Sequence, residues 1–206
     1  MMLWRVRSPT VTSRPPAEFI LPGLPILSKA APSGPEWIHE VKHDGYRLIA
    51  RKDGERVRLW TRQAVDYTGR FVAIADAVRA LPVDACMLDG EAVVYAADGY
   101  DFHALRSRAG ERSAGLIAFD MMSLDGEDLR ALPVEDRRSR LEALLRRRGR
   151  PALMFSAEIH GEGPEIFAHA CALGLEGIVS KRRGSRYRSG PNRDWIKTKN
   201  SAFERP

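Results

Sequence analysis

The hexapeptide Lys42-His43-Asp44-Gly45-Tyr46-Arg47 lies between two stretches in which apolar and polar residues alternate, Trp37–Val41 and Tyr46–Ala50. Alternation of this kind is typical of β-strands, because successive side chains of a strand point to opposite faces. We therefore predict that the hexapeptide is the tight connection between two strands. Gly45 suits this position, since glycine adopts backbone conformations that other residues resist and lets a ligand approach the chain closely.

The same hexapeptide carries three functional groups, the amine of Lys42, the carboxylate of Asp44 and the guanidinium of Arg47. A connection this short places all three around one point. Surface ion pairs combine the same residue types, so Lys-x-Asp-Gly is a weak signal by itself. The hexapeptide becomes informative only together with the charged clusters that follow it in the sequence.

The composition is that of an ordinary soluble globular protein, with 44% hydrophobic and 29% charged residues among 206. No stretch approaches the roughly 20 apolar residues of a membrane span, and the basic N-terminus lacks the apolar segment of a secretory signal. The net charge of +6 is compatible with a polyanionic partner without requiring one. We expect a flexible lead-in over residues 1–18 and a single domain over residues 19–206.

Periodicity and turn residues define the expected elements. Alternating or short apolar runs predict strands at Trp37–Lys42, Tyr46–Lys52, Arg56–Thr61, Leu116–Met122, Gly177–Arg183 and Trp195–Lys199. A further strand pair is expected within Cys86–Ala97, interrupted at Asp89-Gly90. Helical spacing predicts helices at Asp66–Leu81, Phe102–Arg108, Val134–Arg148 and Pro164–Leu173. Because strands and helices do not alternate regularly, we expect an α+β fold with antiparallel sheets.

Two segments have a distinctive composition. Four prolines predict that residues 21–36 form an extended, stiffened segment that leads into the first strand. The helix expected at Val134–Arg148 has leucines on one face, and we expect its arginines on the other. We interpret these arginines as a solvated basic face rather than as a dedicated DNA-binding groove.

Four clusters with charged residues follow the hexapeptide: Asp89-Gly90-Glu91, Phe119-Asp120, Glu176-Gly177-Ile178-Val179-Ser180-Lys181 and Trp195-Ile196-Lys197-Thr198-Lys199. In an extended chain, residues two apart point to the same face, which places Lys197 beside Lys199. Two lysines on one strand face repel each other unless an anion lies before them, and a triphosphate would meet that need. Carboxylates at Glu91 and Glu176 would then hold a divalent metal that bridges the triphosphate.

Lys42 is the candidate nucleophile of such a site. A lysine amine attacks only after it has lost its proton, and most lysines keep theirs at neutral pH. Lys197, Lys199 and a bound Mg²⁺ would disfavour the protonated form, whereas Asp44 and the other acids favour it. The metal must therefore outweigh the acids if the amine is to be activated.

Taken in order, the hexapeptide and the four clusters resemble the nucleotidyltransferase motifs of ATP-dependent DNA ligases. The likeness is greatest to the ligase domain of bacterial non-homologous end-joining ligases, and it covers about residues 19–200. It implies two antiparallel sheets with flanking helices and a nucleotide between them. It also implies a reaction in which Lys42 attacks the α-phosphate of ATP, AMP passes from the lysine to the 5′-phosphate of nicked DNA, and the 3′-hydroxyl then seals the strand.

The resemblance implies a role for each motif residue. Glu40 would recognise the adenine amino group, and Phe119 would stack on the base, although a strand phenylalanine is by default a core residue. Arg47 and Glu91 would address the ribose. Glu176, with Glu91, would bind Mg²⁺ or Mn²⁺, so that ATP and a divalent metal are the implied cofactors.

The remaining roles concern phosphate and DNA. By the same resemblance, Lys197 and Lys199 would hold the α-phosphate, and Asp44 would assist the later steps. Lys181 would contact a phosphate or form the solvated end of its strand. Arg62 lies where the family places an arginine that contacts the nucleic acid backbone, but a Gln-Ala pair follows it where relatives often carry Asn-Gly or Arg-Gly.

Family ligases continue after the last lysine motif into an OB-fold domain, whereas this sequence ends at Pro206. We therefore expect the OB-fold domain to be absent from this chain and expect its partners to be nicked or broken duplex DNA and a separate OB-fold or end-joining protein. We also expect a monomer in the bacterial cytoplasm, associated with the nucleoid. Two alternatives stay open: an RNA ligase or capping-type nucleotidyltransferase, and a non-catalytic remnant that binds DNA ends or proteins.

Overall fold

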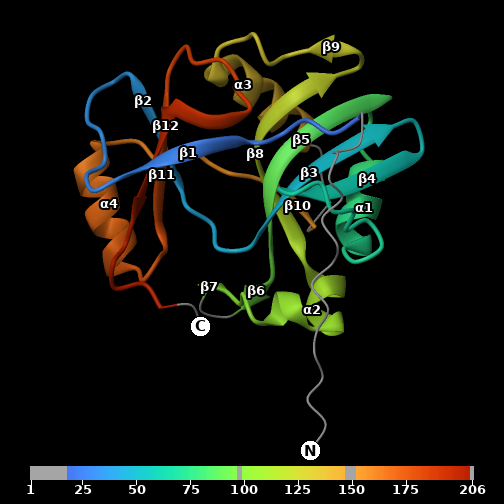
Figure 1. Ribbon diagram of the computed structural model, residues 1–206, viewed down its shortest axis with the longest axis horizontal. Helices are drawn as coiled ribbons and strands as arrows, with labels where there is room; N and C mark the ends of the chain where they lie inside the picture. Colours follow the sequence, from blue (N-terminus) through green and yellow to red (C-terminus); the bar gives the residue numbers. More distant parts are fainter. Residues whose placement is uncertain (1–17, 97–98, 147–151, 205–206) are drawn as a thin grey trace, which may run out of the picture.

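Figure 1 shows the computed structural model of the chain, in which residues 18–96, 99–146 and 152–204 are described. Two β-sheets form the body of the fold, and helices flank them. The expected lead-in over residues 1–18 lies outside the described residues apart from Glu18. The lead-in and the domain boundary at residue 19 therefore stay predictions.

The larger sheet has the strand order β10-β8-β5-β3-β4, with β9 paired to β8 outside this path. Its strands are β3 (Tyr46–Asp53), β4 (Arg56–Thr61), β5 (Ala85–Val93), β8 (Gly115–Leu124), β9 (Glu127–Asp128) and β10 (Leu153–Phe155). Helices α1 (Val72–Arg79) and α3 (Val134–Leu145) pack against it. The main hydrophobic cluster lies between these helices and the sheet, with Leu48, Leu59 and Leu88 at its centre.

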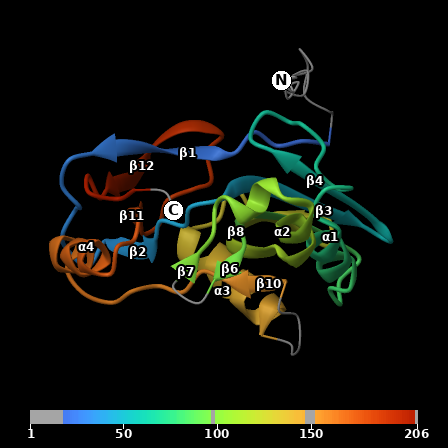
Figure 2. The ribbon, with the colours of Figure 1, turned by 90° about the horizontal axis from the view of Figure 1, so that it is seen from below.

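The smaller sheet has the order β1-β12-β11-β2. Its strands are β1 (Gly23–Ser28), β2 (Trp37–Val41), β11 (Gly177–Arg182) and β12 (Gly190–Lys199). Helix α4 (Gly163–Ala172) covers one face of this sheet through Ile166 and Ala170, as Figure 2 shows from a second side. The hexapeptide connects β2 of this sheet to β3 of the larger one, so the predicted tight connection crosses between the sheets.

A second hydrophobic cluster joins the two sheets. Ile49, Met87 and Met122 contribute to it from the larger sheet, and Trp195 contributes from β12. Between β5 and β8 the chain forms the ribbon β6 (Tyr95–Ala96) and β7 (Gly99–Tyr100), a 3₁₀ turn η1 (Ala104–Arg106) and α2 (Arg108–Ser113). The helix expected at Phe102–Arg108 is therefore wrong: that range contains the 3₁₀ turn η1, and α2 begins only at its last residue. None of the helices in the described ranges is long and apolar enough to cross a membrane.

The predicted α+β class, with two sheets and flanking helices, is confirmed. Strands β2, β3, β4, β8 and β11 lie within two residues of their expected bounds. Most strand pairs are antiparallel, as expected. Two pairs, β1 with β12 and β10 with β8, are parallel, so each sheet is mixed at one edge.

Three other local expectations are wrong. The proline-stiffened segment contains β1, which tolerates Pro25 because an edge strand pairs on one side only. Strand β5 runs through Asp89-Gly90 without a break; a Cβ at position 90 would lie 2.7 Å from the carbonyl oxygen of Ile117, so glycine serves close strand packing there. The helix expected from Asp66 begins at Val72, because the Tyr67 N–H donates to a carbonyl of β4 and ties the preceding turn to that strand.

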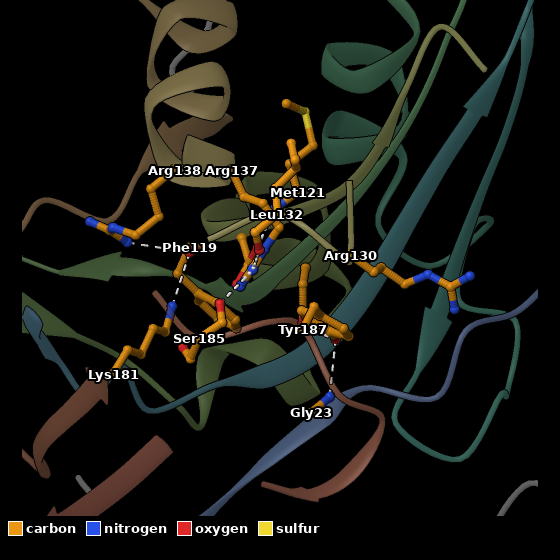
Figure 3. Close-up of polar contacts among 12 residues, drawn as sticks. Gly23, Phe119, Met121, Arg130, Leu132, Arg137, Arg138, Lys181, Ser185 and Tyr187 are labelled. Carbon is orange, nitrogen blue, oxygen red and sulfur yellow. Dashed lines mark hydrogen bonds and ion pairs between the residues drawn. The ribbon is translucent and has the colours of Figure 1, made fainter. Parts of the chain in front are cut away.

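The arginines of α3 are not all solvated, which corrects the expected basic face. Arg137 and Arg138 are 0% and 4% exposed. Arg137 donates two hydrogen bonds to the buried carboxylate of Asp120, from Nε over 2.7 Å and from Nη2 over 2.9 Å. Figure 3 shows both arginines reaching from α3 toward β8. The next arginine along the helix, Arg140, does form an exposed ion pair, with Glu127.

Candidate active site

A cavity of about 240 Å³ lies between the two sheets. Its walls come from β1, β2, β11 and β12 on one side and from β3, β5 and β8 on the other. Eight of the residues predicted from the motifs line it: Glu40, Lys42, Arg47, Arg62, Glu91, Phe119, Lys181 and Lys197. Asp44, Glu176 and Lys199 do not line the cavity itself, although Glu176 contacts Lys42 of its lining and Lys199 contacts Glu176.

Lys42 is held at the mouth of this cavity by an ion pair. Its Nζ lies 2.5 Å from Oε2 of Glu176, whose other oxygen lies 3.0 Å from Nζ of Lys199. Burial acts to raise the pKa of Glu176, but the hydrogen bonds and charges of the two lysines outweigh it and lower that pKa. The carboxylate is therefore ionised at neutral pH and bridges two of the predicted lysines.

Positive charge gathers around Lys197 in the cavity. Burial lowers the pKa of Lys197, and the charges of Lys42, Lys199 and Arg62 lower it further. Arg62 lies in the turn that follows β4, and Ala64 of the same connection has a φ of 61°, a conformation that favours glycine. A concentration of cations that depresses a lysine pKa is complementary to an anionic ligand.

Glu91 faces this charge cluster from β5. Burial raises the pKa of Glu91 to about 7, against the opposing effect of Arg47 and Lys42. The charge of Glu176, the other predicted metal ligand, contributes to the same rise. The described residues contain no group of three or more His, Cys, Asp or Glu side chains arranged for a metal.

Arg47 is committed to a buried network. Its guanidinium binds both carboxylate oxygens of Asp89, over 2.5 and 2.7 Å, and also donates to the carbonyl of Gly23 over 3.1 Å. The Gly23 N–H donates in turn to the Tyr187 hydroxyl, which donates to Asp89 over 2.5 Å. Figure 3 shows Tyr187 above Gly23 of β1. This network fixes β1, an edge of the cavity wall, against the larger sheet.

Phe119 and Glu40 both line the cavity, and both contact Lys181. Phe119 lines the cavity, is 9% exposed, and belongs to none of the three hydrophobic clusters among the described residues. Its ring is flanked by the guanidinium of Arg47 at 4.5 Å and by Nζ of Lys181 at 4.8 Å. The default interpretation of a core phenylalanine is therefore weakened, while its role at the base stays a prediction.

Glu40 is buried and paired with two cations. Its Oε1 lies 2.8 Å from Nη1 of Arg138 and 2.7 Å from Nζ of Lys181. Lys181 is only 1% exposed, so the expectation of a solvated strand end is wrong. The sequence interpretation missed Arg138, although its spacing of three residues from Leu141 places it beside the apolar face of α3.

Asp44 lies on the connection itself and is 6% exposed. A Cβ at the neighbouring Gly45 would overlap the carbonyl oxygen of Ala92, so the close approach predicted for this glycine is made by the protein's own backbone. Lys42 N–H donates to the Gly177 carbonyl over 2.9 Å, which holds the connection against β11. The geometry thus keeps the hexapeptide rigid beside the cavity.

The sequence also matches a known family. A family model described as the ATP dependent DNA ligase domain covers residues 26–199. The chain belongs to this family. The resemblance to ATP-dependent DNA ligases, and to their end-joining members, is thereby confirmed.

Two curated relatives show how the ligase domain is distributed. The chain is 44% identical over 190 residues to the multifunctional non-homologous end joining protein LigD of Pseudomonas aeruginosa, covering 90% of this chain and 22% of that protein. It is 34% identical over 200 residues to a probable DNA ligase of Streptomyces coelicolor, covering 86% of this chain and 39% of that protein. The chain thus spans less than half the length of these ligases.

Solved structures give the same result. The crystal structure of the ligase domain from M. tuberculosis LigD superposes with a TM-score of 0.77 at 33% identity, covering 86% of this chain and 60% of that one. A mycobacterial DNA ligase D complexed with ATP and MES superposes with a TM-score of 0.74 at 33% identity, covering 86% and 59%.

Phe119→Ala tests whether this ring belongs to a ligase base pocket. We expect ATP binding to weaken by about 1–3 kcal/mol, the range for stacking of a base on an aromatic side chain. The measurement is calorimetric titration with ATP, beside a melting curve without nucleotide. Phe71→Ala, in the main hydrophobic cluster, should lower the melting temperature and leave the affinity of the folded protein unchanged. If Phe119→Ala instead lowers the melting temperature and leaves the ATP affinity of the folded protein unchanged, the ring is a core residue.

Proposed function

We propose that this chain is the adenylation domain of an ATP-dependent DNA ligase that seals nicked DNA. The observation that carries the proposal is the position of Lys42, which pairs with Glu176 and lines a cavity between two sheets together with Lys197, Glu91 and Phe119. Family membership supports the same activity. The end-joining names of relatives such as LigD support double-strand break repair as its setting.

In the first step, Lys42 Nζ attacks the α-phosphorus of ATP after losing its proton. A nitrogen–phosphorus bond forms, the bond to the pyrophosphate oxygen breaks, and AMP remains on the lysine. Lys197 and Lys199 are placed beside Lys42 to hold the charged α-phosphate. In the later steps the 5′-phosphate of the nick takes the AMP, with Asp44 assisting, and the 3′-hydroxyl displaces it. Arg62, at the edge of the cavity, is the proposed contact to the DNA backbone.

Glu176 and Glu91 are the residues that would hold Mg²⁺ or Mn²⁺. The fit rests on their chemistry: two neighbouring carboxylates face the cavity's cations, and the pKa of Glu91 is raised to about 7 by burial and by the nearby acids. One or two carboxylates suffice for Mg²⁺ when substrate phosphates supply further oxygens. The metal would neutralise phosphate charge, and it would also compete with Lys42 for Glu176.

The part of the cavity that Glu40 and Phe119 line fits a nucleoside. Glu40 is placed to accept a hydrogen bond from the base edge, and Phe119 to stack on the base face. Arg47 and Glu91 line the same cavity, and we propose that the ribose lies beside them.

We propose that the polymeric substrate is nicked or broken duplex DNA and that the enzyme is a monomer. We also propose a separate OB-fold or end-joining protein as its partner and a location at the bacterial nucleoid in the cytoplasm.

Glu176→Ala should raise the Mg²⁺ concentration needed for half-maximal adenylation, because it removes one hard oxygen ligand. The measurement is the rate of adduct formation across a Mg²⁺ series at saturating ATP. Glu165→Ala, which removes an exposed carboxylate on α4, is the matched control and should leave the midpoint unchanged. An identical midpoint in Glu176→Ala and the wild type would exclude Glu176 as a metal ligand.

Transfer to DNA tests the function itself. After incubation with ATP and Mg²⁺, we expect the intact mass of the chain to increase by that of AMP. Addition of duplex DNA nicked with a 5′-phosphate should discharge this adduct, and the same duplex with a 5′-hydroxyl should not. Discharge by RNA ends alone would identify an RNA ligase or capping-type enzyme. Complete absence of an adduct would identify a non-catalytic binding module.

A further inference from the structure

Two buried cations hold both of the proposed base-recognition residues at once. Arg138 Nη1 lies 2.8 Å from Oε1 of Glu40 and donates to the backbone carbonyl of Phe119 over 3.3 Å. Lys181 Nζ contacts the same two oxygens, over 2.7 Å and 3.0 Å. Figure 3 shows Arg138 and Lys181 approaching Phe119 from α3 and β11. Each cation therefore connects the carboxylate at the base edge with the strand that carries the ring.

Arg138 is the member of this group that is anchored away from the cavity. It does not line the cavity, its side chain is 5% exposed, its Nη2 donates to the Ser156 carbonyl over 2.8 Å, and its guanidinium stacks 4.7 Å from the Phe155 ring. Lys181, by contrast, lines the cavity. Arg138 thus acts on the cavity only through the residues that it positions.

The geometry constrains what Glu40 can accept. The shortest contacts of both cations are to Oε1, so we expect a donor in the cavity to meet Oε2. A carboxylate accepts hydrogen bonds but does not donate them. A base with an exocyclic amino group at that edge gains a hydrogen bond, while a base that lacks the group leaves a buried carboxylate oxygen unpaired.

We propose that Arg138 is a positioning residue for base specificity: it fixes the Glu40 carboxylate relative to the Phe119 ring, so that one base is selected by its edge and its face together. This inference rests on the proposed function. Arg137 is the natural comparison, because it is the adjacent residue of α3 and is buried as well. It donates hydrogen bonds to Asp120 and to the carbonyls of Leu132 and Ser185, and its guanidinium lies over the Tyr187 ring, so that its contacts differ from those of Arg138 with Glu40 and the Phe119 carbonyl.

The test is a competition between ATP and purine riboside triphosphate, which carries hydrogen in place of the 6-amino group. Both are given at equal concentration with Mg²⁺, and intact mass resolves the two adducts on Lys42. Their ratio reports the ratio of kcat/KM and does not depend on the fraction of protein that is folded. We expect Arg138→Gln to lower the preference for ATP about tenfold, the value of one hydrogen bond to a charged group. Arg138→Lys should restore part of it.

Arg137→Gln is the matched control and should keep the wild-type ratio, even though it loses stability. A second measurement needs no reaction. In the Lys42→Ala background without metal, calorimetry gives the ratio of the dissociation constants for the analogue and for ATP. Arg138→Gln should lower this ratio about tenfold, as it lowers the adduct ratio. An unchanged ratio in Arg138→Gln, an equal loss in Arg137→Gln, or a wild type without preference for ATP would each overturn the inference. A wild type that forms neither adduct would instead overturn the proposed function.

Discussion

Lys42→Ala should remove every trace of covalent AMP from the protein while leaving its fold intact. The side chain lies at the mouth of a cavity with 20% of its surface exposed, and the hydrophobic clusters do not include it. Its removal therefore opens no void in the core. The measurements are intact mass after incubation with ATP and Mg²⁺ and a thermal unfolding curve. Any mass increase equal to AMP would show that another group is the nucleophile.

Two further variants sharpen this test. Lys42→Arg keeps a positive charge beside Glu176, yet a guanidinium does not act as a nucleophile at neutral pH, so no adduct should form. Lys29→Ala removes an exposed lysine that follows β1, and its adduct should match the wild type. If Lys42→Arg binds ATP normally but forms no adduct, adenylation needs the nucleophilic amine of Lys42 and not only its positive charge.

Arg137→Met should lower the free energy of unfolding by about 3–5 kcal/mol, because it leaves the Asp120 carboxylate buried without its cation. Both side chains are 0% exposed, so water cannot replace the lost partner without a structural change. The measurement is equilibrium unfolding in urea. The same helix provides the control: Arg140→Met breaks an exposed pair and should cost less than about 1 kcal/mol.

A double variant distinguishes a lost partner from lost packing. Arg137→Met combined with Asp120→Leu removes both charges, and it should be more stable than Arg137→Met alone. Equal unfolding free energies for Arg137→Met and Arg140→Met would show that the buried pair contributes no more than a surface pair.

Alternation and turn residues were sufficient for the strands around the hexapeptide. Apolar and polar residue types alternate along these strands, which is the sequence signal of a strand. Strands β2, β3 and β4 nevertheless contain consecutive buried residues, such as Leu48, Ile49 and Ala50 of β3, so both faces are covered there. Edge strand β1 carries a weaker pattern because Pro25 interrupts it, and its partner β12 lies more than a hundred residues away. Because residue alternation is read over a few neighbouring residues, it does not predict the pairing of β1 with β12.

The motifs predicted which residues share the cavity, but not what holds them there. Glu40 and Phe119 were found from their motifs, whereas Arg138 was assigned to a solvated face. A helical pattern treats arginine as exposed, and its burial here depends on the Ser156 carbonyl and on Glu40, which lie far from it in sequence. Tyr187, Asp89 and Arg47 likewise form one network from three separate segments.

The parallel pairing of β1 with β12 has a consequence for synthesis. A nascent chain emerges N-terminus first, and the strands of the larger sheet all lie between residues 46 and 155. This sheet can therefore form while translation continues. Strands β1 and β2 must wait for β11 and β12, which occupy residues 177–199. Their unpaired edges stay open to chaperones until then. The cavity wall that carries Trp195 and Lys197 leaves the ribosome after the other walls, so the cavity is incomplete until then.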